Sequence, residues 1–168
     1  MSTVNEPTGD CVIAGRTERG TGPSFRSMNP ATEASIGPEV RAAGTEQVDR
    51  ACQAAWEAFK ANAARSREER AGMLEACAER ILGLGDSLVA QASEETGLGR
   101  ERIAMERNRT VGQFRMFAGV VREGTWVDAV IDRAEPDRKP LPKPDVRRML
   151  RPLGPAAVFG ASNFPLAY

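Results

Sequence analysis

The sequence contains no histidine. A Ser-His-Asp or Cys-His catalytic system, in which an imidazole accepts the proton of the nucleophile, therefore cannot form within it. Zinc sites with the usual spacing of cysteine and histidine are excluded for the same reason, and we expect no metal centre. Cysteine is scarce, with only Cys11, Cys52 and Cys77 at wide spacing. An odd number of distant thiols argues against a disulfide framework and is typical of a reducing compartment.

The sequence also has no net charge, because 23 lysines and arginines balance 23 aspartates and glutamates. Nucleic-acid binding would need a basic excess or stripe, so we expect no nucleic-acid partner. No hydrophobic run is long enough to cross a bilayer, and the first ten residues lack the apolar core of a signal peptide. These absences predict a cytoplasmic location and no membrane partner.

The first 44 residues have the pattern of short strands and turns. The apolar run at residues 11–16 predicts a strand. A turn at Asn29 and Pro30 divides residues 24–37 into two further possible strands. Helical spacing begins after this region.

Several helices are predicted between residues 45 and 121. Thr45 is a good N-cap for the first, and Ser66 with Glu69 matches a capping box at the start of the second. Asp86 can cap a third helix over 88–95 that stops at Gly97. A long helix follows from about residue 100 to 121. Residues expected on the buried helix faces are Val48, Cys52, Ala55, Phe59, Met73, Leu74, Cys77, Ile81, Leu82, Ile103, Val111, Phe114 and Ala118.

After Gly124 the pattern changes to period two. Residues 125–132 and 146–152 read as strands, and the loop between them, residues 134–145, contains four prolines. The two strands predict a long hairpin that projects from the helices. Its exposed edges would favour pairing with a partner subunit.

The last fourteen residues contain the most specific pattern. The apolar run 156–159 predicts a buried parallel strand, and a turn of small residues follows it. Asn163 would then extend from the carboxyl end of the strand, where open α/β sheets bind their ligands. Its amide could donate a hydrogen bond to a developing oxyanion. The alternative is that Asn163 is only a turn residue before Phe164 and Pro165.

The pattern RPLGPAAVFGASNFPLAY at residues 151–168 resembles the start of the dinucleotide-binding strand of aldehyde dehydrogenases. Further similarity lies in MNPATEASIG, in SREERAGMLEACAERILGLGDSLVAQASEETGL and in ERNRTVGQFRMFAGVVREGTWVDAVID. Order and spacing agree over most of residues 24–168. The version FGASNFPLAY is similar to the branch that includes 2,5-dioxovalerate (α-ketoglutaric semialdehyde) dehydrogenases.

The resemblance implies the fold class, which is α/β, and more narrowly the N-terminal part of the aldehyde dehydrogenase fold. Residues 1–124 would be strands and helices of the cofactor domain, 125–152 a bridging hairpin for homo-oligomers, and 153–168 the first dinucleotide-binding strand. The implied reaction is oxidation of 2,5-dioxovalerate to 2-oxoglutarate with NAD or NADP, through attack of a cysteine thiolate on the aldehyde. The family's catalytic Cys and Glu match nothing within these 168 residues, so we expect the chain alone to be inactive.

The resemblance also assigns site residues. Asn163 matches the oxyanion-stabilising residue, and Phe159, Gly160, Ala161 and Ser162 match the strand end along the cofactor, although many relatives have Pro-Trp before the Asn. Met105, Arg109 and Met116 share one side of the long helix. The resemblance places that side by the substrate tunnel, together with Phe164.

Arg109 would bind the carboxylate of an acidic aldehyde, which a planar guanidinium can contact with two hydrogen bonds. The alternative is a surface arginine paired with Glu101 or Glu106. At the level of the whole chain, the competing hypothesis is a non-catalytic remnant or an interaction module that uses the hairpin. The DNA downstream of the Tyr168 codon distinguishes these readings.

Overall fold

The computed structural model describes residues 7–167. These residues form four α-helices, one short 3₁₀ helix and three separate two-stranded antiparallel sheets. In chain order the elements are β1 (Cys11–Ile13), β2 (Arg16–Glu18), β3 (Ser24–Met28), β4 (Ser35–Arg41), α1 (Thr45–Ala63), α2 (Arg67–Gly83), α3 (Gly85–Thr96), α4 (Arg100–Glu123), η1 (Thr125–Val127), β5 (Val130–Asp132) and β6 (Val146–Arg148). The combination confirms the α/β class.

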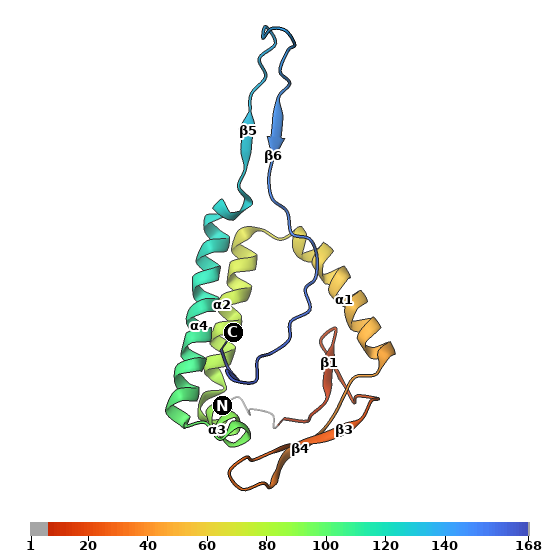
Figure 1. Cartoon of the computed structure of the whole chain (residues 1–168), viewed down its shortest axis with the longest axis vertical. Coiled ribbons are helices and arrows are strands. Elements are labelled where there is room, and N and C mark those ends of the chain that lie inside the picture. The colour runs from red at the N-terminus through yellow and green to blue at the C-terminus, as the bar shows by residue number, and fades with distance from the viewer. Residues whose placement is uncertain (1–6, 168) are drawn as a thin grey trace.

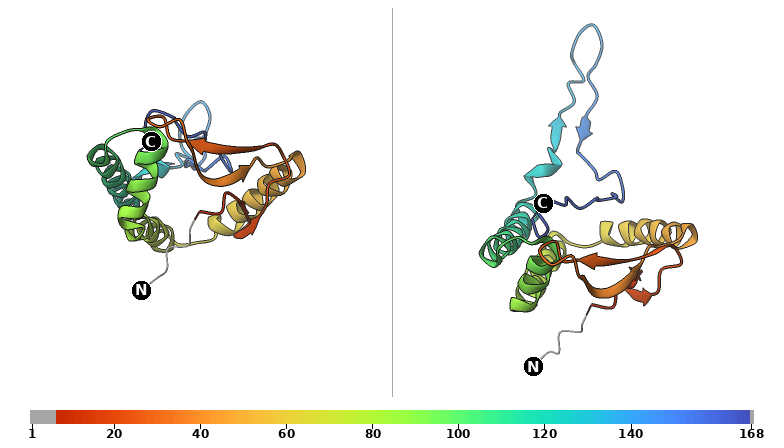
Figure 2. Two further views of the ribbon diagram at one scale, coloured as in Figure 1. Left: turned by 90° about the horizontal axis from the view of Figure 1, so that it is seen from below. Right: turned by 60° about the horizontal axis from the view of Figure 1, so that its bottom comes forward.

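The elements are arranged as an open frame (Figure 1). Helices α2, α3 and α4 stand on one side, α1 on the other, and β1 to β4 form the base. The β5–β6 hairpin projects away from the frame, and Figure 2 shows it well separated from the helices. After β6 the chain turns back into the frame, so that the C-terminal segment reaches α2 and α4.

The turns between the N-terminal strands determine where each strand ends. Residues 11–16 were expected to form one strand, but β1 pairs with β2 in a hairpin instead. Ala14 and Gly15 between them both have positive φ, 51° and 75°, as a two-residue hairpin turn requires. The strands expected on either side of Asn29 and Pro30 are confirmed as β3 and β4.

The helix starts show one correction and one confirmation. Gly44, not Thr45, is the N-cap of α1. The buried Gln47 side chain accepts from the N–H of Gly44 at 3.1 Å and from the N–H of Thr21 at 2.9 Å, which ties the helix start to the strands. The capping box of Ser66 with Glu69 is present at the start of α2.

Helices α2 and α4 pack along one another and hold most of the buried core of the described chain. Ala71 and Ala78 of α2 and Ala118 of α4 are fully buried, so the two backbones approach closely. Ile103 is also fully buried and packs with Val89 and Ala92 of α3. Phe114, expected on the inner face, is half-buried.

Two glycines end helices in the left-handed conformation. Gly97 at the end of α3 has φ 70°, as expected, and Gly124 at the end of α4 has φ 75°. The start of α3 was wrongly predicted, because the helix begins at Gly85 and Asp86 lies in its first turn rather than capping it.

The apolar face of α1 is largely uncovered. Val48 and Trp56 are about half exposed, at 48% and 47%. Cys52, expected in the core, is exposed, and Cys77 on α2 is half-buried. The helical spacing of these residues is correct, but β1 and residues 154–157, which lie beside this face of α1, cover it only in part.

The paired strands of the hairpin are shorter than expected. Residues 125–127 form a 3₁₀ turn, and the paired strands are only Val130–Asp132 and Val146–Arg148, with one isolated bridge between Glu135 and Lys143 further along the hairpin. All six residues of β5 and β6 are exposed. The two strands therefore bury no apolar side chains against the frame that could stabilise a longer pairing. None of the helices within residues 7–167 is long and apolar enough to span a membrane.

The buried strand expected at residues 156–159 is not present. The segment has no strand structure, and Val158 and Phe159 are 85% and 93% exposed. A parallel strand is defined by hydrogen bonds to neighbours, and the described residues contain no strand that pairs with this one. The segment remains extended chain with an apolar sequence.

Candidate functional site

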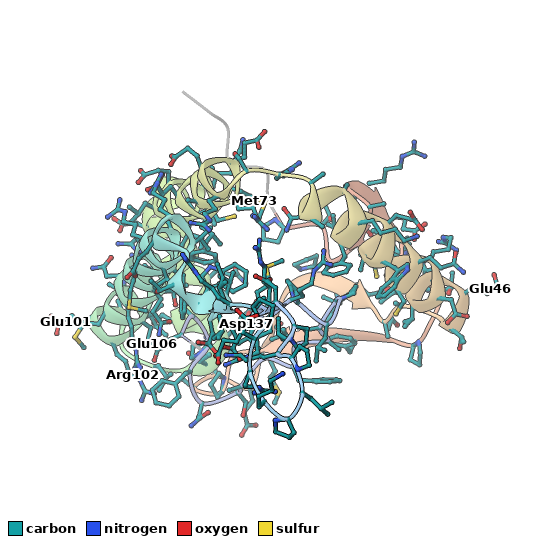
Figure 3. All side chains as sticks on the ribbon, turned by 90° about the horizontal axis from the view of Figure 1, so that it is seen from above. Glu46, Met73, Glu101, Arg102, Glu106 and Asp137 are labelled. Atoms are coloured by element: carbon teal, nitrogen blue, oxygen red, sulfur yellow. The ribbon has the colours of Figure 1, made fainter. Side chains whose placement is uncertain are left out.

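One face of α4 carries three polar side chains one helical turn apart. Arg102, Glu106 and Thr110 stand at positions i, i+4 and i+8 of the helix, so they project from the same side. Figure 3 shows Arg102 and Glu106 as neighbours on this side, while Glu101 points away. We call Arg102, Glu106 and Thr110 the α4 row.

The α4 row binds the backbone of residues 163–166. Arg102 donates from Nη2 to the carbonyl oxygen of Asn163 at 2.8 Å. The carboxylate of Glu106 accepts from the N–H of Leu166 at 3.2 Å, and the hydroxyl of Thr110 donates to the Leu166 carbonyl. A turn in which the Ala167 N–H donates to the Phe164 carbonyl at 3.3 Å closes the segment.

Glu106 is the buried member of the row, with 6% of its surface exposed. A buried carboxylate is costly unless it is paired and hydrogen-bonded. Here Arg102 Nε donates to Glu106 Oε1 at 3.1 Å, while Oε2 accepts from Leu166. The Arg102 guanidinium also lies 5.5 Å from the centroid of the Phe164 ring, within the range of a cation–π contact.

The structure brings two of the predicted site residues, Asn163 and Phe164, onto α4. Asn163 lies in a turn with an exposed side chain. The predicted location at the carboxyl end of a sheet strand is wrong for this structure, because residues 156–159 form no strand.

The predicted substrate residues of α4 lie beside the α4 row. Met105 and Arg109 each precede a row member by one residue, so they leave the helix about 100° away from it. Both are exposed, Met105 by 65%. Their placement on one side of α4 agrees with the expected spacing, and their role in binding substrate stays a prediction.

The predicted cofactor residues do not enclose a site. Phe159, Gly160, Ala161 and Ser162 are all exposed. A Cβ added at Gly160 would meet no atom within 4 Å, so the space beside this glycine is open. The residues described here therefore do not fit a dinucleotide by themselves, and at most they form one side of its site.

An apolar cleft of about 600 Å³ borders the docked segment and Thr110 of the α4 row. Its lining includes Leu74, Ile81, Leu88, Phe114, Pro165 and Leu166. Met105, Arg109 and Asn163 do not line it. The cleft is thus separate from the residues that were predicted to bind substrate.

The sequence reasoning missed the α4 row. The spacing of Arg102, Glu106 and Thr110 was visible, but charged residues one turn apart on a helix usually indicate a solvated face. Only the docking of residues 163–166 from the far end of the chain gives these side chains their partners.

Comparison with known proteins decides the family. Residues 17–168 match the aldehyde dehydrogenase family. The chain belongs to this family. Among its relatives, "Alpha-ketoglutaric semialdehyde dehydrogenase 2" of Azospirillum brasilense is 45% identical over 162 residues, which is 96% of this chain and 31% of that protein. "Alpha-ketoglutaric semialdehyde dehydrogenase" of Acinetobacter baylyi is 39% identical over 165 residues, 98% of this chain and 31% of that protein.

The fold agrees with the family. A solved NAD-dependent benzaldehyde dehydrogenase from Corynebacterium glutamicum superposes with a TM-score of 0.70 at 21% identity, over 79% of this chain and 28% of that one. The chain thus has the fold of the N-terminal part of an aldehyde dehydrogenase, and it spans about 31% of the length of the two semialdehyde dehydrogenases.

Proposed function

We propose that this chain is the N-terminal part of an enzyme that oxidises 2,5-dioxovalerate to 2-oxoglutarate with NAD or NADP. The observation that carries the proposal is the 45% identity to an alpha-ketoglutaric semialdehyde dehydrogenase across 96% of the chain. The chain alone would be inactive, because the nucleophilic Cys and the general-base Glu of the family match no residue in it.

Asn163 is the proposed catalytic residue of this part. When a thiolate attacks an aldehyde, the carbonyl oxygen gains negative charge, and a side-chain amide placed beside it stabilises that charge. The exposed side chain of Asn163 is available for this contact, while its carbonyl oxygen is engaged by Arg102. The amide would come into contact with the substrate once the thiolate-bearing part of the enzyme covers the segment.

Arg109 is the proposed specificity residue. The proposed substrate carries a carboxylate at the end opposite to the aldehyde, and a guanidinium forms two parallel hydrogen bonds with such a group. Met105, one helical turn before Arg109 on the same side of α4, and Phe164 would form the apolar wall along the carbon chain.

The nicotinamide cofactor, when bound, accepts the hydride that leaves the aldehyde carbon. Phe159, Gly160, Ala161 and Ser162 are proposed as one side of its site. Their exposure is consistent with a segment that is completed by further strands and glycine-rich turns. In the same arrangement residues 1–124 belong to the cofactor domain, and 125–152 form the bridging hairpin of a homo-oligomer.

The experiment is an activity assay of the protein encoded by the whole reading frame that contains this chain. NAD(P)H formation is followed with 2,5-dioxovalerate and with hexanal as a neutral control. The proposal predicts a much higher kcat/KM for 2,5-dioxovalerate. Oxidation of neither aldehyde, or a preference for hexanal, would contradict it.

The exposed hairpin favours a second candidate, a non-catalytic interaction module. Every paired residue of β5 and β6 is exposed, which leaves both edges open to another chain. The DNA after the Tyr168 codon separates the two candidates. A continuing frame with a later Cys supports the enzyme, and an authentic stop codon supports the module.

A further inference from the structure

We infer that Arg102, Glu106 and Thr110 are positioning residues that fix the orientation of Asn163 for the reaction. The inference rests on the proposed function, since it concerns how Asn163 is held rather than what it does. None of the three needs to touch the substrate. Each acts through the backbone of the segment that carries Asn163.

The contacts form a clamp along a single helix. Arg102 donates to the carbonyl of Asn163, Glu106 accepts from the N–H of Leu166, and Thr110 donates to the carbonyl of Leu166. The row advances by one helical turn at each step while the bound chain runs alongside it. Both ends of the segment at residues 163–166 are therefore tied to one rigid element.

Backbone contacts suit this task better than side-chain packing. They fix the course of the main chain and leave the Asn163 side chain exposed to its reaction partner. Catalytic donors act only when they are held close to the productive geometry, and a misplacement of about 1 Å can cost a hundredfold in rate.

Arg102 and Glu106 act as a pair. The buried Glu106 carboxylate needs the Arg102 Nε contact at 3.1 Å, and Nη2 of Arg102 donates to the Asn163 carbonyl at 2.8 Å. The same guanidinium covers the Phe164 ring at 5.5 Å. A planar fork can make these contacts at once, whereas a lysine ammonium cannot reproduce their geometry.

Thr110 gives the sharpest test, because two variants distinguish the effect of its hydroxyl group from the effect of its side-chain shape. Thr110→Val keeps the branched side chain and removes the donor to Leu166, while Thr110→Ser keeps the hydroxyl. Arg115→Gln is the control on the same helix, since Arg115 pairs with Glu79 and does not contact the segment. All variants are made in the protein encoded by the whole reading frame.

Two readouts are measured: the kcat and KM for 2,5-dioxovalerate, and exchange of the backbone amide hydrogens of Asn163, Phe164, Leu166 and Ala167. Thr110→Val is expected to lower kcat by about tenfold to a hundredfold, with little change in the KM for NAD(P)⁺, and to accelerate exchange in the segment. Thr110→Ser and Arg115→Gln are expected to stay close to wild type in both readouts.

Unchanged kcat and exchange in Thr110→Val would overturn the inference, and so would an equal loss in Thr110→Ser. A wild-type protein that oxidises no aldehyde would overturn the proposed function and the catalytic purpose of the clamp with it. In that case amide exchange still tests whether the α4 row holds the segment. Faster exchange in Thr110→Val would support the clamp, and unchanged exchange would refute it.

Discussion

Arg109 shows how neighbouring residues of one helix divide their tasks. Arg102 is turned onto the docked C-terminal segment, where it contacts Glu106 and Asn163. Arg109 follows seven residues later, and its exposed side chain lies beside that contact row rather than within it. Two arginines on one helix are thus proposed for different purposes, one for holding the backbone and one for meeting a substrate carboxylate.

Replacing Arg109 tests the second purpose. Arg109→Met in the complete enzyme is expected to raise the KM for 2,5-dioxovalerate about tenfold or more, because a charge-assisted contact to the substrate carboxylate is lost. The KM for hexanal, which has no carboxylate, should change little. Steady-state kinetics on both aldehydes, with Arg115→Met as an α4 control, measure the difference. Equal effects on the two substrates would refute the assignment.

At the scale of elements, α2 and α4 are joined by a charge network centred on Arg122. Its guanidinium donates to both Glu68 and Glu75 of α2. These hydrogen bonds lower the pKa of each carboxyl from the ordinary value of 4.5, with the direct bond to Arg122 as the largest cause. They also raise the pKa of Arg122, so the arginine stays charged throughout.

The network predicts a pH dependence. Because the folded pKa of Glu68 and Glu75 lies below the unfolded one, their contribution to stability is present above about pH 4.5 and is lost as the pH falls through the folded values. Arg122→Gln should therefore lower the melting temperature at neutral pH and reduce its decline in acid. Arg122→Lys keeps the positive charge but lacks the planar guanidinium. Its melting temperature at neutral pH should lie between those of the wild type and Arg122→Gln. Identical melting curves for wild type and Arg122→Gln across the acid range would contradict this account.

Some of the elements could be predicted from the sequence and others could not. The Ser66–Glu69 capping box and the stop at Gly97 depend on residues within a few positions, and both are confirmed. The strand at 156–159 depends on hydrogen bonds to other strands, so its apolar pattern could not by itself produce one. Asn163 was identified as a site residue from a resemblance. Arg102 and Thr110 were missed because their partners lie more than fifty positions away in the sequence.

At the scale of the whole molecule, the frame leaves apolar surface uncovered. Leu153, Val158 and Phe159 are 100%, 85% and 93% exposed, and the α1 face with Val48 and Trp56 is about half exposed. Extended apolar chain with unpaired N–H and C=O groups is a template for pairing with another copy.

This surface predicts self-association of the 168-residue chain. The double change Val158→Lys and Phe159→Lys is expected to reduce aggregation without altering helix content, because it places two charges on the exposed segment. Leu141→Lys, at a hairpin position that is 70% exposed, is the matched control and should have little effect. Light scattering measures association and circular dichroism measures helix content. Equal improvement by Leu141→Lys would show that general charge, rather than this segment, governs association.

The most direct measurement of the central claim is the turnover of Asn163→Ala in the protein encoded by the whole reading frame, assayed with 2,5-dioxovalerate and NAD(P)⁺. If the Asn163 amide stabilises the oxyanion, kcat should fall by about 10²- to 10³-fold while the KM for the cofactor stays near wild type. A variant that keeps the wild-type kcat would show that Asn163 is only a turn residue and would contradict the catalytic role proposed for this segment.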